Sequence, residues 1–141
     1  MFYLDTSVMA AYYCPEPLSE KAEEFIVTHS DLAISHLTEL ELYSAIARKI
    51  REGNLNKGDG SRIIAKFSAH RKKGFYLVLP ITPDHYRLAR EWIAQFSTPL
   101  RSLDALHLAV TSLSDSILVT ADEKLSRSAQ QFSLQAHLMV P

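Results

Sequence analysis

The stretch FYLDTSV, Phe2 to Val8, does most to decide which fold we expect for this chain of 141 residues. Its first residues are typical of a buried strand, and they run directly into Asp5. Because an Asp side chain is almost never fully buried without a partner, Asp5 must have a specific role. Two interpretations are open: Asp5 caps a helix that begins at Thr6, or it holds a ligand at the end of the strand.

Short runs of β-forming residues alternate along the chain with longer segments of helical period. The expected strands are Met1–Leu4, Leu32–Ser35, Tyr76–Ile81, Ser116–Thr120 and Leu134–Val140. The expected helices are Thr6–Cys14, Glu20–Thr28, His36–Glu52, Lys57–Lys73, a segment from Pro83, Ser102–Ser114 and Asp122–Phe132. Thr82 and Ser102 are expected to cap the helices that they precede or begin. This alternation predicts an α/β fold, a three-layer α/β/α sandwich around a mainly parallel sheet of four to five strands.

The region around Asn54–Gly60 is expected to be a turn that joins two helices, so that they form a hairpin inserted into the α/β pattern. The chain is short enough to form one domain, residues 1–141, and long enough to bury a real core. Its net charge of -1 excludes a protein that is held on nucleic acid by bulk positive charge. It does not exclude a nucleic-acid enzyme whose acidic centre balances a basic rim.

A cytoplasmic location is expected from cysteine usage and from the N-terminal residues. Cys14 is the single cysteine, so no internal disulfide can form. Asp5 comes too early for a signal peptide, no basic segment precedes it, and no apolar run approaches the length of a membrane span.

Four acidic residues map to one edge of the predicted sheet. Asp5 and Asp122 follow strands, Asp104 lies in the first turn of a helix, and Glu41 lies in the second turn of the helix after LAIS. Ligands of open α/β sheets bind outside the carboxyl ends of the strands, which is the edge where these acids are expected. Clustered carboxylates repel one another, and a hard cation such as Mg²⁺ or Mn²⁺ relieves that repulsion.

Each acid also has an ordinary structural interpretation. Asp5 and Asp122 are suited to helix capping, Asp104 opposes a helix dipole, and Glu41 is an ordinary helix residue. His107 follows Asp104 by three residues, so it either lies near the site or is a structural histidine of that helix. No HxxH or HExxH pair and no Gly-rich phosphate loop is present.

Four motifs in this order resemble those of PIN-domain ribonucleases, specifically the VapC-type toxins of toxin–antitoxin pairs. They are FYLDTSV with Asp5, ISHLTELEL, LRSLDALHLA with Asp104, and ILVTADEKL with Asp122. In the second motif the spacing from the Thr selects Glu41 rather than Glu39. The ending LQAHLMVP also resembles the last strand of the family.

The resemblance implies an endoribonuclease that hydrolyses RNA phosphodiester bonds with Mg²⁺ or Mn²⁺ held by the four acids. It implies that Thr6 or Ser7 orients Asp5 or a metal-bound water, and that Thr120 acts similarly near Asp122. The implied partners are a small antitoxin, which blocks the site, and a second copy of the chain in a homodimer. Arg101, beside Asp104, is the best candidate for an RNA contact.

Three other functions were weighed against the ribonuclease. A catalytically degenerate PIN domain would bind protein or RNA without cleaving it. A nuclease for structured DNA would normally need further domains and more acids. A phospho-acceptor receiver domain would need an acidic pair after the first strand and an Asp after YLVLPI, and this sequence has neither.

Overall fold

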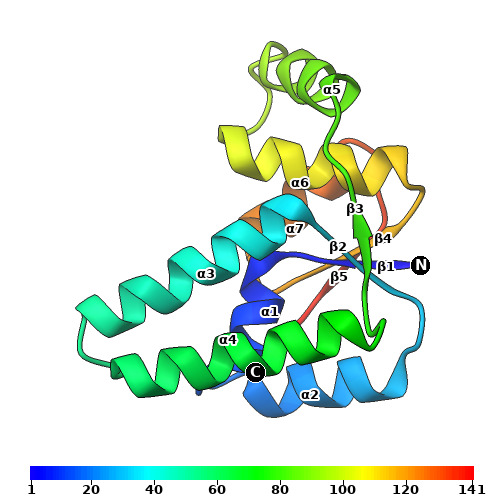
Figure 1. Ribbon diagram of the computed structural model, residues 1–141. Coiled ribbons are helices and arrows are strands. Elements are labelled where there is room, and N and C mark those ends of the chain that lie inside the picture. Colours follow the sequence, from blue (N-terminus) through cyan, green and yellow to red (C-terminus); the bar gives the residue numbers. More distant parts are fainter.

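The computed structural model describes residues 1–141 as a sheet of five parallel strands between two layers of helices (Figure 1). The strands are β1 (Phe2–Leu4), β2 (Leu32–Ser35), β3 (Leu77–Leu79), β4 (Ile117–Thr120) and β5 (Ala136–Leu138), in the order β3-β2-β1-β4-β5. The predicted α/β class and all five strands are confirmed. β3 is shorter than the expected Tyr76–Ile81, and Pro80 follows it, which has no N–H group to continue the ladder.

The helices are α1 (Thr6–Tyr13), α2 (Ser19–Thr28), α3 (His36–Arg51), α4 (Lys57–Lys72), α5 (Pro83–Ile93), α6 (Ser102–Leu113) and α7 (Glu123–Gln131). Figure 1 shows α2 and α4 on one side of the strands, and α5 and α6 on the other. None of these helices is both long and apolar enough to cross a membrane.

Alternation along the strands divides the core into two halves. Leu4 and Val119 pack with buried residues of α1 to α4, whereas Tyr3 and Leu118 pack with α6 and α7. Successive residues of a strand point to opposite faces, so each central strand supplies both halves. The three-layer arrangement expected from the sequence is therefore confirmed.

Two local expectations were wrong. The expected start of the second hairpin helix at Lys57 is confirmed, but the turn before it ends at Asn56 rather than at Gly60. Asn56 caps α4 and exchanges hydrogen bonds with Asp59, so the two glycines belong to the start of the helix. A Cβ atom at Gly60 would lie 2.7 Å from Cδ1 of Ile50, so glycine permits the close approach of α3 and α4.

The cap of α6 is Arg101, and Ser102 is its first helical residue. The Thr82 cap of α5 is confirmed.

The strand order creates a switch point next to β1. The chain adds β2 and β3 on one side of β1, and then returns to add β4 and β5 on the other side. Helices leave the sheet in opposite directions at such a point, which opens a crevice at the carboxyl ends of the strands. Asp5 follows β1 and Asp122 follows β4, so both flank this crevice.

Candidate active site

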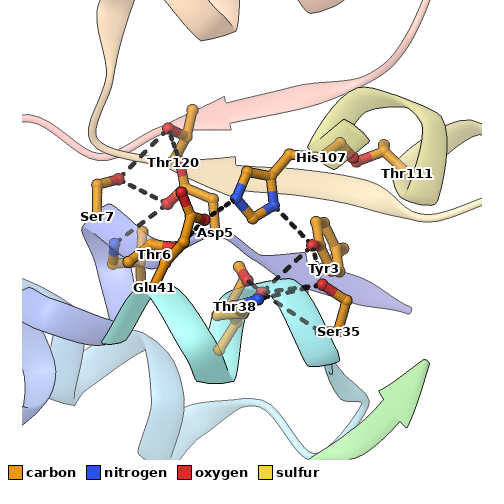
Figure 2. Close-up of polar contacts among 12 residues, drawn as sticks. Tyr3, Asp5, Thr6, Ser7, Ser35, Thr38, Glu41, His107, Thr111 and Thr120 are labelled. Carbon is orange, nitrogen blue, oxygen red and sulfur yellow. Dashed lines mark hydrogen bonds and ion pairs between the residues drawn. The ribbon is translucent and has the colours of Figure 1, made fainter. Parts of the chain in front are cut away.

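Asp5 lies at the end of β1 with only 3% of its surface exposed. The Ser7 hydroxyl donates to its Oδ1 over 2.6 Å, and the Thr120 hydroxyl donates to its Oδ2 over 2.5 Å (Figure 2). The Val8 N–H donates to Oδ1 over 3.2 Å, so Asp5 also caps α1. The structure thus confirms the cap. Oδ1 accepts two hydrogen bonds and Oδ2 accepts one, so Oδ2 keeps a lone pair for a further ligand.

Glu41 extends from the second turn of α3 toward the same crevice. The Thr6 hydroxyl donates to its Oε1 over 2.6 Å, and Nε2 of His107 lies 2.5 Å from that oxygen. A quarter of the Glu41 side chain is exposed, whereas only 4% of the His107 side chain is. Glu41 is therefore held on its buried side and remains open to solvent on the other.

Asp104 and Asp122 come from the first turn of α6 and the cap of α7, and both are half-buried. Asp122 accepts the N–H groups of Lys124 and Leu125, so it is a helix cap as well as a candidate ligand. The backbone N–H of Asp122 donates to the Thr120 hydroxyl over 3.0 Å. Thr120 thus connects the end of β4 to Asp5, and not only to Asp122.

A hollow of about 340 Å³ opens beside these two acids. Asp104 and Asp122 line it together with two exposed cations, Arg101 and Lys124. Side chains of both charges therefore line the same hollow.

The carboxylates influence one another electrostatically. Burial raises the pKa of Asp104 above its ordinary value, the charges of Asp122, Glu41 and Asp5 raise it further, and His107 opposes the rise. Burial also raises the pKa of Asp5, against His107 and the hydrogen bonds of Ser7 and Thr120. Burial alone would raise the pKa of Glu41, but His107 and Thr6 lower it below its ordinary value.

We therefore expect an Asp104→Asn variant to be more stable than wild type in EDTA at pH 7.5. A raised pKa in the folded state means that ionisation of Asp104 costs stability as the pH rises above the pKa of the unfolded chain. The gain in Tm, roughly 2–4 °C for each kcal/mol in a domain of this size, should shrink as the pH falls and should vanish below the pKa of the unfolded chain. Thermal unfolding from pH 3.5 to 7.5 measures it. A variant that is less stable than wild type at pH 7.5 would contradict the assigned repulsion.

The donor set fits a hard divalent cation. Its members are carboxylate oxygens, whose mutual repulsion a positive ion would relieve. No group of three or more His, Cys, Asp or Glu side chains is close enough together in this structure to form a complete protein cage for a metal. Mg²⁺ rarely needs such a cage, since one or two carboxylates with water and substrate phosphate usually hold it. Asp5, Glu41, Asp104 and Asp122 are the residues that could supply those carboxylates.

Comparison with protein families identifies the fold. The PIN domain family model matches residues 2–130. The chain belongs to the PIN domain family. No curated protein sequence matches it.

Solved structures with the same fold include known toxins. VapC20 of Mycobacterium tuberculosis, described as a toxin that cleaves the sarcin–ricin loop, is 17% identical with a TM-score of 0.74, and the match covers 91% of this chain and 95% of VapC20. PAE2754 of Pyrobaculum aerophilum is 26% identical, with a TM-score of 0.66 and coverage of 90% and 84%. DNA-bound VapBC of Salmonella typhimurium is 17% identical, with a TM-score of 0.71 and coverage of 99% and 98%.

The structure of this PIN domain places the predicted acids at one sheet edge and assigns contacts to the residues expected to orient them. Ser7 contacts Asp5 as expected, whereas Thr6 contacts Glu41 rather than Asp5. Tyr3 is the residue that the sequence analysis overlooked. Its position in a buried strand was a usable signal, because a buried Tyr hydroxyl needs a partner.

Proposed function

We propose that this PIN domain is a metal-dependent endoribonuclease of the VapC type, the toxin of a toxin–antitoxin pair. The observation that supports this most is the arrangement of Asp5, Glu41, Asp104 and Asp122 at the switch point of the sheet, where burial and the charges of the other three acids raise the pKa of Asp104. Four carboxylates with only a structural role would gain nothing from lying close enough to repel one another. The proposed location is the cytoplasm.

The acids of the site provide the negative charge that would hold Mg²⁺ or Mn²⁺. When bound, such an ion supplies positive charge to the phosphodiester and activates water, which is the chemistry needed for hydrolysis. Asp104 and Asp122 both line the hollow, which supports a role for their carboxylates in holding the ion. Ser7 and Thr120 each donate to one oxygen of the Asp5 carboxylate and fix its plane, and Thr6 holds Glu41 by Oε1. No side-chain nucleophile is required.

RNA would meet the site through the cations at the rim of the hollow. Arg101 immediately precedes α6, and Lys124 lies in the first turn of α7, so both are anchored by elements that also carry a site acid. They line the same hollow as Asp104 and Asp122. A phosphate beside the scissile bond can therefore pair with Arg101 while the acids face the bond itself.

An Arg101→Ala variant is expected to bind single-stranded RNA more weakly and to lose about 0.7 from the slope of log K against log salt, as for one lost phosphate contact. Arg87→Ala is the matched control, because Arg87 is an exposed residue of α5 paired with Asp84. Fluorescence anisotropy at several salt concentrations, in EDTA to prevent cleavage, measures both. An Arg101 variant with the wild-type slope would remove this contact from the proposal.

The proposed protein partners are a small antitoxin and, in a homodimer, a second copy of the chain. Structures of relatives include DNA-bound VapBC of Salmonella typhimurium and a VapBC-1 structure from nontypeable Haemophilus influenzae. An acidic site attracts a cationic side chain as well as a metal, so an antitoxin that inserts Arg or Lys would compete for the same carboxylates.

The function is tested with purified protein, free of any partner, and a mixed pool of single-stranded RNA. Cleavage with Mg²⁺ or Mn²⁺ that EDTA abolishes is the expected result. Cation binding without cleavage of any RNA would contradict the enzyme and favour the alternative, a degenerate PIN domain that acts as a protein- or RNA-binding module. Cleavage that persists in EDTA would contradict the proposed metal dependence.

A further inference from the structure

A second layer of polar side chains lies in the interior, next to Asp5 and Glu41 (Figure 2). Its members are fully or almost fully buried: Tyr3, Ser35 and Thr38 have no exposed surface, and His107 has 3%. Each is close in sequence to a site acid or to its helix. Tyr3 precedes Asp5 by two residues, Thr38 precedes Glu41 by three, and His107 follows Asp104 by three. These spacings place each on the same side of its strand or helix as the acid.

His107 connects this buried layer to the site. Its Nδ1 lies 2.7 Å from the Tyr3 hydroxyl, and its Nε2 lies 2.5 Å from Oε1 of Glu41. An ionised carboxylate can only accept hydrogen bonds, so Nε2 is the donor to Glu41. The Tyr3 hydroxyl also contacts the hydroxyl of Ser35 at 2.8 Å and that of Thr38 at 3.2 Å. Both imidazole nitrogens are thus fully engaged, which fixes the orientation of the ring.

The two bonds to Glu41 meet at one oxygen. Thr6 from α1 and His107 from α6 both donate to Oε1, whereas Oε2 has no hydrogen-bond partner in the protein. Two donors from different helices fix the plane of the carboxylate, which a single bond would leave free to rotate. The free oxygen therefore has a defined direction before any ligand arrives.

We propose that His107 is a positioning residue of the site, which holds Glu41 by Oε1 so that Oε2 is the oxygen available to a divalent cation or its water. This inference rests on the proposed function, since it assigns a use to Glu41 in cation binding. The connection of His107 to Tyr3 makes the position of Glu41 depend on the rigid core rather than on the flexible Glu side chain. Groups that orient metal ligands in this way typically change metal affinity by about 10- to 100-fold when they are removed.

A pair of substitutions separates positioning from a merely structural role. The amide nitrogen of Gln can replace Nε2 of histidine, so His107→Gln can keep the bond to Glu41 while it loses that to Tyr3. Asn is shorter and reaches the position of Nδ1, so His107→Asn can keep the contact with Tyr3 while it loses that with Glu41. Thr111→Val is the matched control, because the Thr111 hydroxyl bonds the His107 carbonyl on the same buried face of α6 without touching Glu41.

Mn²⁺ affinity of the whole protein, measured by calorimetry without RNA, is the main readout, and thermal unfolding is recorded for every variant. We expect His107→Asn to weaken Mn²⁺ binding by about 10-fold or more, while His107→Gln stays within about threefold of wild type. Thr111→Val should bind Mn²⁺ as wild type does, whatever its stability. If His107→Asn does not fold, Thr6→Val removes the other bond to Oε1 at a partly exposed position and should weaken Mn²⁺ binding several-fold.

Three results would overturn the positioning role. If His107→Asn binds Mn²⁺ as tightly as wild type, the bond from His107 to Glu41 is irrelevant to cation binding. If His107→Asn does not fold, a wild-type Mn²⁺ affinity in Thr6→Val would show that the bonds to Oε1 are irrelevant. Equal losses in the Asn and Gln variants would show that the imidazole acts only through packing. In these cases wild type still binds Mn²⁺ and cleaves RNA, so the proposed function stands. Wild type that neither binds Mn²⁺ nor cleaves RNA would overturn both proposals.

Discussion

An Asp104→Asn variant is expected to cleave RNA about 100-fold more slowly than wild type or not at all, because the charge that a metal ion supplies to the transition state is worth several kcal/mol. Asp104 is the acid whose pKa responds to all three of the others: besides burial, the charges of Asp122, Glu41 and Asp5 raise it. Asn keeps the shape and removes the charge. The variant should therefore fold normally, with the higher stability in EDTA described above, and still lose activity.

Asp115→Asn is the matched control for this experiment. Asp115 is exposed in the turn after α6, at the opposite end of the helix from Asp104, and its φ of 51° is a conformation that Asn also adopts. The control should cleave RNA at the wild-type rate. Initial rates at saturating Mn²⁺ with one labelled RNA measure both variants. An Asp104→Asn protein with the wild-type rate would remove this acid from the mechanism.

A Phe67→Ala variant is expected to lose about 3–5 kcal/mol of unfolding free energy, as for other deletions of a buried aromatic ring. Only 1% of Phe67 is exposed, and its ring centroid lies 5.5 Å from that of Tyr13 and 6.3 Å from that of Tyr76. It thus joins α4 of the hairpin to α1 and to the residue before β3. The expected loss is a large part of the roughly 5–15 kcal/mol that stabilises a typical domain.

The same variant tests our proposal that residues 1–141 form one domain. If the hairpin is part of a single core, unfolding of Phe67→Ala in urea should remain one transition at a lower midpoint. Phe96→Ala is the control, because Phe96 is 89% exposed and should change stability by less than about 0.5 kcal/mol. Two separate transitions, or a stability equal to wild type, would show that the hairpin is not integrated in this way.

Much of the fold was predictable from local pattern. The strand Leu32–Ser35 was predicted with the bounds that the structure shows. It is a short apolar run between the polar Asp31 and the start of α3, and all four of its side chains are buried. The errors arose where side chains altered a boundary. Lys57 was correctly predicted as the first residue of α4, but the glycines after it suggested a turn that ran on to Gly60. The reciprocal bonds of Asn56 and Asp59 end that turn at Asn56. Ser102 suggested a cap, but helical backbone already includes it.

The candidate acids could be found from the sequence because each lies just after a strand or in the first two turns of a helix at the same sheet edge. Their partners could not be assigned in this way, since a hydrogen bond between residues far apart in the chain depends on side-chain directions. Thr6 was one of two candidates to orient Asp5 or a metal-bound water, yet it bonds to Glu41. Asp5 and Asp122 were given capping and ligand roles as alternatives, and the structure shows that both cap helices at the edge where the acids meet.

The most direct test of the account is to locate Mn²⁺ by anomalous diffraction in crystals of the wild-type protein soaked with the ion. The account predicts a peak at the carboxyl edge of the sheet, about 2 Å from oxygens of at least one or two of Asp5, Glu41, Asp104 and Asp122. The peak should be absent from crystals of the Asp104→Asn variant soaked in the same way. A saturating soak that gives no peak at this edge, or a peak only at other residues, would contradict the claim that these acids form a cation site.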